Sequence, residues 1–588
     1  MKRTGPVKMK DAIKRATDDQ DKIFLPQETV VMVKQRMNAM ALKILDQTMR
    51  IDNGRLDIPV FFSTCGHDAQ AVIGTKKQMG KGATPAQAEA SAVMELAERF
   101  SFFSFYANRD HTRLGTVDQF AGEAIAFDQI AKSVHDESGD LDVARRIFES
   151  LPLRWTGAWN LTREKDVLIP LDWFFAINAF NGPSAGNCVE EALCQGICEI
   201  VERHVSSMIS RRQISTPLID PASATDRLVR EMLGKYDKAG IKVFITDFTQ
   251  GMGIPSVGVL AYYPVTFPGR SEIVWTAGTT PNPEKALSRA LTEVAQLAGD
   301  FNSGSTYVAS GLPKFTRLED ADYVINAPGP ISLANLPDLS QPNIRREVEA
   351  CIQALAQRDF EVLVVDTTHP QLAVPAFYTI VPGAHFRERA AGTSVAMFAA
   401  KITMERFGAD EAIKRLTDME RLLPGKYFIQ FYLGNCHLER NDPQTALRHL
   451  ARALELSPAI QDIPSIYAYM GVCHKELGDY ETALAVLAKG EALDPERTDI
   501  HNLKGFCHFM RKEHEAAIQS FETVIALDPS SAIDYANIAS NYRDMGKKTD
   551  AVHYYRLALA LDPSIDFARD NLERLTGKTE DGGPNSEI

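Results

Sequence analysis

The sequence predicts a large mixed α/β (α+β) domain followed by an all-α solenoid of repeats. Strand and helix patterns alternate up to about residue 405, whereas the strand pattern ends there and a helical pattern recurs from 410 to 575. In the first domain, three predicted helices also carry the same arrangement of small and acidic residues. We therefore expect domains at 1–405 and 410–575, and a disordered acidic tail at 576–588.

The composition is that of an ordinary globular protein. Of 588 residues, 45% are hydrophobic and 24% are charged, and the net charge of −13 comes without a long basic run, so we expect no nucleic-acid partner. The basic N-terminus lacks the apolar core of a signal peptide, and no apolar run could cross a membrane. We therefore expect a cytoplasmic protein without a membrane partner. Eight cysteines without a CxxC motif predict neither a disulfide framework nor a zinc site.

The first domain begins with mostly helical residues at 1–50. A strand is expected to end near Thr64, and a second strand near Ala71–Thr75 leads into the glycine-rich loop Gly80-Lys81-Gly82, which precedes a helix. Such a loop can present backbone N–H groups to phosphate. The later strands are expected within 154–177 and at Lys242–Asp247, Ile254–Ala261, Glu272–Ala277, Glu361–Asp366 and 376–381.

Three predicted helices share one pattern of residues. Each has two small residues four apart, an acid three later, and an acid or amide three further on. The sets are Ala88, Ala92, Glu95, Glu98; Ala192, Gly196, Glu199, Glu202; and Ala286, Ala290, Glu293, Gln296. Residues three and four apart share one helix face, so Ser91, Gln195 and Arg289 join these faces from the preceding turn.

The three acidic faces allow two interpretations. Each helix could expose its acids to water separately, or the three faces could converge on one pocket. Converging carboxylates cannot be buried without compensating cations. Oxygen ligands suit Mg²⁺, which is commonly bound by carboxylates together with substrate phosphates. Because the pattern occurs three times, we favour convergence and predict a nucleoside triphosphate held through magnesium.

Residues 410–575 repeat with a fixed spacing. Gly434, Gly471, Gly505 and Ala539 are equivalent at spacings of 37, 34 and 34 residues, and Cys436, Cys473 and Cys507 follow the same register. The period resembles the tetratricopeptide repeat, a helix–turn–helix unit that stacks into a solenoid. The cysteines are expected in its core. Its concave face could bind a peptide or protein, or the solenoid could only stabilise or dimerise the first domain.

Several motifs resemble the YcaO family over residues 10–405. They are GKGAT before ELAER (95–99), the loop NGPSAGN (181–187) before Glu199, Glu202 and Arg203, and ALSRALTEVAQ (286–296). This resemblance implies an enzyme that uses ATP and Mg²⁺ to phosphorylate the oxygen of a backbone amide in a peptide or protein substrate. A nucleophile then attacks the carbonyl carbon, which gives an azoline, a thioamide or an amidine.

The resemblance also assigns roles to residues. Glu95, Glu98, Glu199 and Glu202 would bind Mg²⁺, and Glu293 would join or support them. Lys81, Ser91, Ser184, Asn187, Gln195, Arg203 and Arg289 would contact ATP, and Glu199, Glu202, Arg203 and Arg289 are the predicted catalytic residues. No Ser-His-Asp triad is needed, and His204 is interpreted as a structural neighbour of Arg203 rather than a base.

The sequence departs from azoline-forming members of the family in two ways. It ends in a solenoid and an acidic tail instead of a proline-rich PxPxP tail, and it has no room before residue 50 for a leader-peptide-binding module. Thioamidation with a TfuA-like partner, or an accessory role in modifying a ribosomal protein, is therefore at least as well supported. We expect a homodimer. The competing hypothesis is a non-catalytic nucleotide-binding adaptor that recruits a partner through its repeats.

Overall fold

A computed structural model describes residues 5–15, 22–52, 54–178, 180–270, 272–298, 301, 312–386, 393–528 and 531–577. The chain divides into two compact units, Met1–Phe398 and Ala399–Ile588. This division falls within helix α12 (Val395–Arg406), a few residues before the predicted end of the first domain. Residues 578–588 of the predicted tail lie outside the described part of the chain.

The strands of the first unit form three sheets. The first is β1-β2-β3 and the second is β10-β9-β8, while the third has the order β4-β5-β11-β12-β7 with β6 added on β5. All pairings between these strands are antiparallel, which makes the unit an α+β structure. The strands are β1 (Leu45–Arg50), β2 (Val60–Cys65), β3 (Lys77–Lys81), β4 (Arg113–Gly115), β5 (Leu153–Asn160), β6 (Lys165–Pro170), β7 (Pro183–Ala185), β8 (Lys242–Asp247), β9 (Ser256–Tyr262), β10 (Ile273–Thr279), β11 (Leu363–Asp366) and β12 (Ala376–Ile380).

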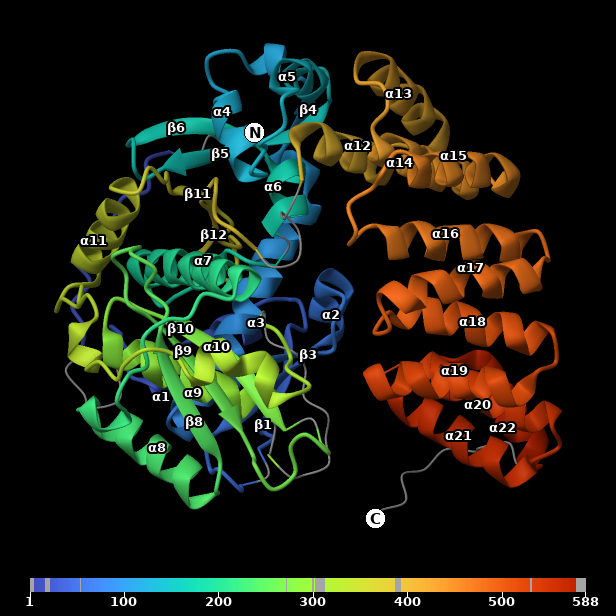
Figure 1. Cartoon of the computed structure of the whole chain (residues 1–588). Helices are drawn as coiled ribbons and strands as arrows, with labels where there is room; N and C mark the ends of the chain where they lie inside the picture. The colour runs from blue at the N-terminus through green and yellow to red at the C-terminus, as the bar shows by residue number, and fades with distance from the viewer. Residues whose placement is uncertain are drawn as a thin grey trace. The chain divides into compact units, whose positions relative to one another are not determined.

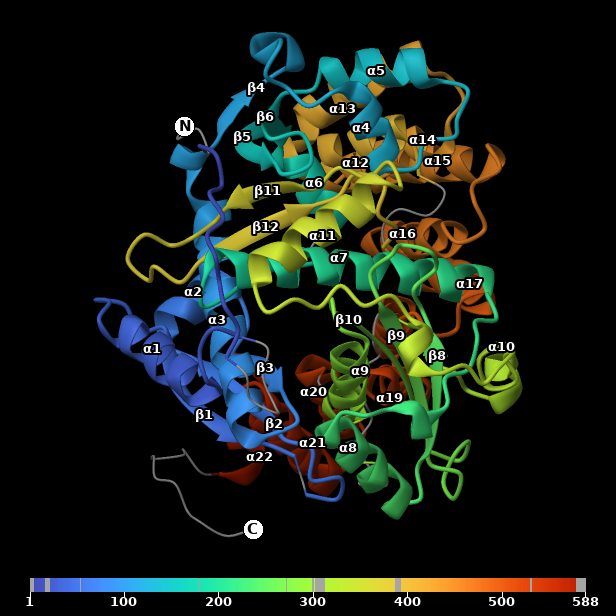
Figure 2. The same ribbon diagram turned by 90° about the vertical axis from the view of Figure 1, so that its left-hand side faces the viewer.

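The helices of the first unit pack on and between these sheets (Figure 1). They are α1 (Pro26–Asn38), α2 (His67–Ile73), α3 (Pro85–Ala107), α4 (Phe127–Ser133), α5 (Leu141–Glu149), α6 (Leu171–Asn178), α7 (Val189–Arg212), α8 (Arg227–Lys238), α9 (Pro283–Ala298), α10 (Asp322–Ile325) and α11 (Ile344–Ala356). Helix α7 crosses the middle of the unit beneath β11 and β12, and α3 and α9 lie near it (Figure 2). Among the described residues, no helix combines the length and the apolar character that a membrane crossing requires.

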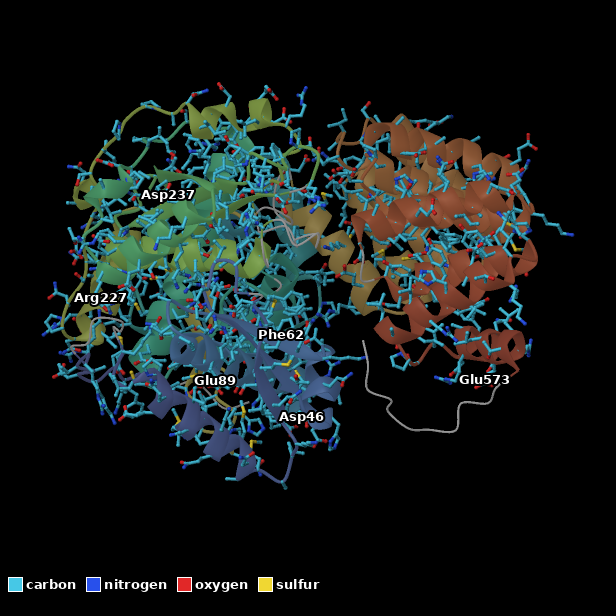
Figure 3. All side chains as sticks on the ribbon, turned by 90° about the horizontal axis from the view of Figure 1, so that it is seen from below. Asp46, Phe62, Glu89, Arg227, Asp237 and Glu573 are labelled. Carbon is cyan, nitrogen blue, oxygen red and sulfur yellow. The ribbon has the colours of Figure 1, made fainter. Side chains whose placement is uncertain are left out.

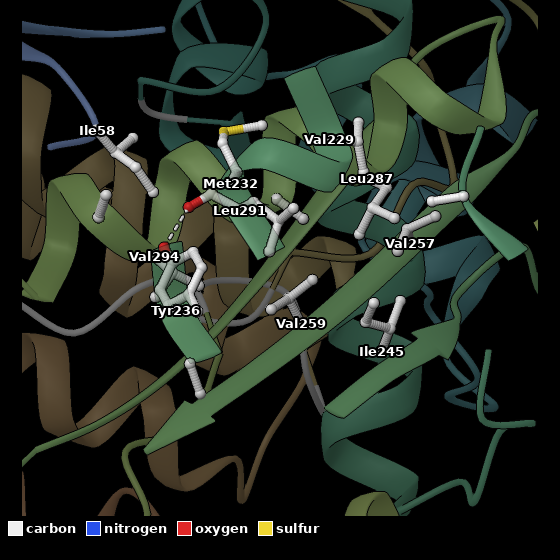
Figure 4. Packing of buried hydrophobic residues seen from close by; sticks show 14 of the residues in the cluster. Ile58, Val229, Met232, Tyr236, Ile245, Val257, Val259, Leu287, Leu291 and Val294 are labelled. Carbon is white, nitrogen blue, oxygen red and sulfur yellow. Dashed lines mark hydrogen bonds between the residues drawn. The ribbon is translucent and has the colours of Figure 1, made fainter. Parts of the chain in front are cut away.

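A large apolar cluster joins α8 and α9 to the second sheet (Figure 4). Val257 and Val259 of β9 pack beneath Leu287 and Leu291 of α9. The ring of Tyr236 is fully buried there, and its hydroxyl donates to the Leu291 carbonyl at 2.7 Å. Charged residues such as Asp46 and Arg227 lie on the outside of the unit, with about half of each side chain exposed (Figure 3). This contrast marks the buried acids described below as unusual.

Four sequence predictions in the first unit are wrong in detail. The sequence predicts mostly helix over residues 1–50, but within their described part only α1 is a helix, and Leu45–Arg50 form strand β1. Residues 67–73 form helix α2 instead of a strand near 71–75, because Gly66 precedes the helix and Gly74 ends it with φ of 82°. Gly80 and Lys81 belong to strand β3 rather than to a loop. Residues 171–178 continue the predicted strand region as helix α6, whose residues are buried almost throughout. A buried apolar run fits a strand or a helix equally well from sequence.

The second unit is helical throughout its described residues and stacks four helix pairs, as predicted. Its helices are α13 (Ala409–Leu422), α14 (Tyr427–Glu439), α15 (Pro443–Glu455), α16 (Ile463–Glu476), α17 (Tyr480–Leu493), α18 (Thr498–Met510), α19 (His514–Leu527), α20 (Ala532–Asp544), α21 (Lys548–Leu561) and α22 (Asp566–Thr576). Cys436, Cys473 and Cys507 are fully buried in this unit. All eight cysteines of the chain are free thiols, as expected.

Candidate active site

The three acidic helix faces line one cavity of about 570 Å³. Helices α3, α7 and α9 supply most of its walls, and strand β3 adds Lys81. Ten predicted site residues line it: Lys81, Ser91, Glu95, Glu98, Asn187, Gln195, Glu199, Arg203, Arg289 and Glu293. Gln296 lines it as well. The interpretation of three separate solvent-exposed helices is therefore wrong.

Glycines bring the three helices close enough to share this cavity. A Cβ added to Gly80 in β3 would lie 2.1 Å from the backbone nitrogen of Ala92, and one added to Gly278 in β10 would lie 2.2 Å from the Ala286 carbonyl oxygen. On α7, a Cβ at Gly196 would meet the Thr379 hydroxyl at 2.3 Å. The small residues of the repeated pattern thus pack each helix against a strand.

Two predicted site residues do not line the cavity. Ser184 is fully buried in β7, and its hydroxyl lies 3.5 Å from the Phe377 carbonyl. Glu202 is 4% exposed and accepts hydrogen bonds from the Thr279 backbone N–H at 3.0 Å and from Arg289 Nε at 3.1 Å. The assignments of Ser184 to ATP and of Glu202 to Mg²⁺ stay predictions.

Arg289 is held by two residues on one face of α7. Its Nε bonds Glu202, and its Nη1 donates to Gln195 Oε1 at 2.9 Å. The neighbouring carboxylates outweigh burial and raise the pKa of Arg289. Arg203 differs, because its buried Nε finds no acceptor among the residues that the structure describes. An acceptor entering the cavity could satisfy this donor.

The cavity contains nearly balanced charges of both signs. Five acids line it, Glu95, Glu98, Glu191, Glu199 and Glu293, together with six cations, Lys22, Lys81, Arg99, Arg203, Lys285 and Arg289. Lys81 forms an ion pair with Glu293, and Arg99 lies 3.4 Å from Glu98. The side chains of the chain itself therefore supply part of the positive charge that these carboxylates need. A bound triphosphate would add several negative charges to this balance.

Burial nevertheless acts strongly on these acids. It raises the pKa of Glu95 and of Glu199, and raises that of Glu98 well above its usual range, although Arg99 opposes the rise for Glu98. The carboxylate of Glu199 raises the pKa of Glu98 further. Burial and the guanidinium of Arg289 lower the pKa of Lys81 to about 7. Such shifts are typical of binding and catalytic sites.

The donor chemistry of the cavity fits magnesium in a specific way. Among the described residues, no three His, Cys, Asp or Glu side chains form a ready-made metal cluster. Magnesium commonly takes only one or two carboxylates and completes its shell with water and substrate phosphates. Glu95, Glu98 and Glu199 provide oxygen donors of this kind along the cavity wall. The residues therefore suit Mg²⁺ that arrives with a nucleotide.

The structure adds site residues that the sequence analysis did not select. Glu191 accepts hydrogen bonds from the backbone and side-chain nitrogens of Asn187, at 3.0 and 2.9 Å, and from the Ile23 backbone N–H at 2.8 Å. Phe24 and Thr29 line the cavity near this anchor. The four-residue spacing of Glu191, Gln195, Glu199 and Arg203 could have revealed Glu191. No local pattern could have placed Phe24 beside α7.

The predicted phosphate-binding backbone at the start of α3 is already occupied. The Ala83 N–H donates to Gln87 Oε1 at 3.0 Å, and the Gln87 N–H donates to the hydroxyl of Thr84, the N-cap residue. His204 is 5% exposed, and its Nδ1 accepts from the His385 backbone N–H at 2.9 Å. His204 does not line the cavity, in agreement with its predicted structural role.

The sequence matches known families in both units. Residues 79–385, more than half of the chain, match the family described as YcaO cyclodehydratase, ATP- and Mg²⁺-binding. Residues 474–532 and 535–565 match tetratricopeptide repeat families.

Among curated relatives, an uncharacterised protein of Methanothermobacter thermautotrophicus is 28% identical over 61% of this chain and 93% of its own length. An uncharacterised protein in the tfuA 3′ region of Rhizobium leguminosarum is 25% identical over 62% of this chain and 89% of its own. The ribosomal protein S12 methylthiotransferase accessory factor YcaO of Escherichia coli is 29% identical over 52% of this chain and 56% of its own.

Solved structures agree with the fold. A heterocyclase in complex with substrate and cofactor has a TM-score of 0.53 and 20% identity, covering 65% of this chain and 54% of its own. YcaO from Methanopyrus kandleri, bound with AMPPCP and Mg²⁺, has a TM-score of 0.50 and 22% identity, covering 66% of this chain and 98% of its own. With the matched sequence family and the shared cavity of three acidic helices, these similarities lead to one conclusion: the chain belongs to the ATP- and Mg²⁺-binding YcaO family and carries tetratricopeptide repeats after its YcaO domain.

Proposed function

We propose that this chain is an ATP- and Mg²⁺-dependent enzyme that phosphorylates the oxygen of a backbone amide in a peptide or protein. The observation that carries the proposal is the single cavity in which acids of α3, α7 and α9 alternate with Lys81, Arg203 and Arg289. A binding protein that only senses a nucleotide would not need so many buried charges of both signs, because burying them is costly.

The proposed reaction balances without a redox partner. The amide oxygen forms a bond to the γ-phosphorus of ATP, and the bond to the ADP oxygen breaks. A nucleophile then bonds to the former carbonyl carbon, and inorganic phosphate leaves with the original oxygen. An amide oxygen is a poor leaving group until it is phosphorylated. Magnesium, when bound, would neutralise phosphate charge in the first step.

The side chains of the chain would position and neutralise the phosphates. Arg289 is fixed by Glu202 and Gln195, so its guanidinium would reach the nucleotide in a set orientation at little entropic cost. The unpartnered Nε of Arg203 would donate to a phosphate oxygen. Glu95, Glu98 and Glu199 would hold Mg²⁺ against the phosphates, with Glu293 beside them. Ser91, Asn187 and Gln195 would contact the nucleotide.

Binding of ATP tests this assignment first. Glu199→Gln removes one buried charge, and we expect it to weaken Mg²⁺-dependent ATP binding by at least about tenfold, as loss of a charged contact in a shielded site commonly does. The matched control is Glu89→Gln on α3, because Glu89 pairs with Lys34 and does not line the cavity. Calorimetric titration with ATP, with and without Mg²⁺, measures both variants. Equal affinity in the two would contradict the proposed site.

The names of two relatives narrow the proposed product of the reaction. One relative is named for its position in a tfuA region, and another is named an accessory factor of a ribosomal protein methylthiotransferase. We therefore propose thioamidation or a related backbone modification of a peptide or ribosomal protein, with a TfuA-like or other partner binding the repeats. Measuring ADP release in the presence of candidate peptides and sulfide tests this proposal. We expect turnover that depends on sulfide, and a gain in peptide mass because sulfur replaces the amide oxygen.

The competing candidate is a nucleotide-binding adaptor without turnover. The groove of the second unit favours it, because α14, α16 and α18 line it with Tyr432, Tyr469 and Asn502, residue types suited to holding a partner. ADP release separates the candidates. An adaptor would bind ATP and a partner, and would release no ADP when any candidate peptide and nucleophile are added.

A further inference from the structure

A second cavity of the first unit lies at the C-terminal end of α7. Its volume is about 410 Å³, and its lining includes Ser207, Arg211 and Arg212 of α7 together with His135 and His385. None of these residues lines the first cavity, between α3, α7 and α9, which we call the ATP cavity after the proposed function. We refer to it as the α7 C-terminal cavity.

The two cavities follow one row of side chains along α7. Glu191, Gln195, Glu199 and Arg203 line the ATP cavity, and the same four-residue spacing continues to Ser207 and Arg211 in the α7 C-terminal cavity. Four residues advance a helix by about 6 Å. The second cavity therefore begins about one helical turn beyond Arg203, which is the last residue of α7 to line the ATP cavity.

The hydroxyl of Ser207 indicates a ligand. The residue is 1% exposed, and its Oγ finds no hydrogen-bond partner within the described part of the chain. Two other buried helix hydroxyls bond the carbonyl one turn before, Thr403 to Ala399 at 2.7 Å and Ser520 to Ala516 at 2.9 Å. The hydroxyl of Ser101 on α3 resembles that of Ser207 in finding no partner among the described residues, but Ser101 does not line either cavity. A buried hydroxyl without a partner costs free energy unless something in the cavity accepts its hydrogen bond.

The remaining polar groups of the cavity suit an anion. Arg211 and Arg212 supply two positive charges, and Glu137 is the acid that faces them among the lining residues described. The imidazoles of His135 and His385 stack with centroids 3.7 Å apart and planes 6° apart. Burial lowers the pKa of both rings, to about 3 for His385, so each ring is neutral at neutral pH. The Nε2 of His135 lies 3.4 Å from the Ala384 carbonyl oxygen, so the N–H of His385 is the ring donor left for a ligand.

We propose that the α7 C-terminal cavity is a second ligand site, and that it binds an oxyanion, either inorganic phosphate or a carboxylate group. Arginine and hydroxyl donors around a partly buried cavity are the groups that recognise such ions. Inorganic phosphate is a product of the proposed reaction, and a carboxylate could belong to the second substrate. The binding itself does not depend on the proposed reaction.

A simpler explanation accounts for only some of these features. Arginines in the last turn of a helix are favourable because they complement the negative end of the helix dipole. This accounts for Arg211 and Arg212, and Arg211 also donates to the Phe386 carbonyl. It does not account for the buried hydroxyl of Ser207 or for a cavity in front of it.

Nuclear magnetic resonance of the full chain with ¹³C-labelled histidine rings tests the proposal, because His135 and His385 report on this cavity. The probes are inorganic phosphate, sodium acetate and sodium chloride at equal ionic strength. We expect saturable shifts of these two histidines with phosphate or acetate and none with chloride. The oxyanion that binds more tightly shows whether the cavity takes inorganic phosphate or a carboxylate group.

Variants test whether the hydrogen-bond donors of α7 are responsible for oxyanion binding. Arg212→Gln should weaken it about tenfold through loss of a charged contact, and Ser207→Ala should weaken it several-fold. Arg230→Gln, an exposed arginine of α8, is the matched control. Arg289→Gln alters the ATP cavity and should leave the shifts unchanged, which separates this outcome from that of the proposed function. The proposal is overturned if phosphate and acetate shift the histidines no more than chloride does, or if both cavity variants bind like the unaltered chain.

Discussion

The two units use small residues in the same way and charged residues in opposite ways. In the first unit, Gly80 and Gly278 let α3 and α9 lie directly on β3 and β10. In the second unit, Gly434 and Gly471 let Leu450 and Leu487 of the partner helix pack closely. A regular row of small residues therefore indicates close packing in both units, and it does not by itself indicate a ligand.

The charges distinguish the two units. On α3, α7 and α9 the small residues are followed by acids that face a shared cavity, whereas α14, α16 and α18 bury cysteines and aliphatic residues at comparable positions. Exposed arginines of the second unit pair with neighbouring acids at the surface, as Arg452 does with Glu455. The functional information in such a repeat lies in its charged positions, because buried charge is retained only where it is compensated or used.

The largest expected effect tests this contrast between arginines. Arg289→Gln should lower ATP turnover by about 100-fold or more, because a preorganised donor to developing phosphate charge is lost. Arg452→Gln in the second unit should change turnover less than about twofold, since the exposed ion pair of Arg452 with Glu455 contributes little. Steady-state ADP release at saturating ATP measures both. Comparable losses in the two variants would show that the contrast between the units is incorrect.

The next prediction concerns glycine packing against backbone. Gly278→Ala places a methyl group 2.2 Å from the Ala286 carbonyl and 2.7 Å from the Ala290 nitrogen, so β10 and α9 must separate. We expect roughly 3 kcal/mol of lost stability, at the upper end for an overpacked core. Chemical denaturation of the full chain, followed by tryptophan fluorescence, measures it, because Trp275 lies in the same strand. Gly139→Ala, with open space around its Cβ, is the control.

Much of this arrangement was accessible from the sequence. The fixed spacing of Gly434, Gly471 and Gly505 predicts the helical repeats, because one helix pair per period is a local property. The recurring acid pattern at Glu95, Glu199 and Glu293 predicts three helix faces, and its repetition predicts that they meet. Both predictions depend on periodicity, which is determined by neighbours along the chain.

The remaining features depend on tertiary contacts. Glu202 has the same spacing from Glu199 as Glu98 has from Glu95, yet it bonds Thr279 and Arg289 instead of lining the cavity. Residues 67–73 are helical because glycines bound the segment at both ends, although its composition permits a strand. Which residue of a shared helix face reaches a cavity is decided by the opposing elements, and a single sequence does not specify them.

The third prediction concerns histidines, and its expected effect on stability is smaller. In the first unit His385 stacks on His135, and no acid among the described residues acts on its ring, whereas His508 in the second unit lies 2.7 Å from Glu513. The pKa of His385 is lowered to about 3 from 6.5, so its contribution to stability is complete above pH 6.5 and is lost as the pH falls toward 3.

Between pH 7 and pH 5 this loss should amount to about 1–2 kcal/mol for His385. His385→Gln should remove that part of the acid sensitivity, and His508→Gln should not. Denaturant titrations at both pH values measure the difference. An unchanged pH dependence in His385→Gln would mean that the stack does not oppose protonation.

The smallest effect concerns glycine packing in the second unit. A Cβ added at Gly434 would lie 2.9 Å from Leu450 Cγ and 3.3 Å from the Ala446 carbonyl oxygen, and the fully buried side chain of Leu450 would have to shift. Alanine gains up to about 1 kcal/mol over glycine within a helix, which offsets part of that cost. For Gly434→Ala we therefore expect a loss of stability of at most about 1 kcal/mol, smaller than that of Gly278→Ala. Denaturation of the two variants side by side compares the two losses. A loss at Gly434 as large as that at Gly278 would mean that the solenoid is packed as rigidly as the helix–strand contacts around the cavity of α3, α7 and α9.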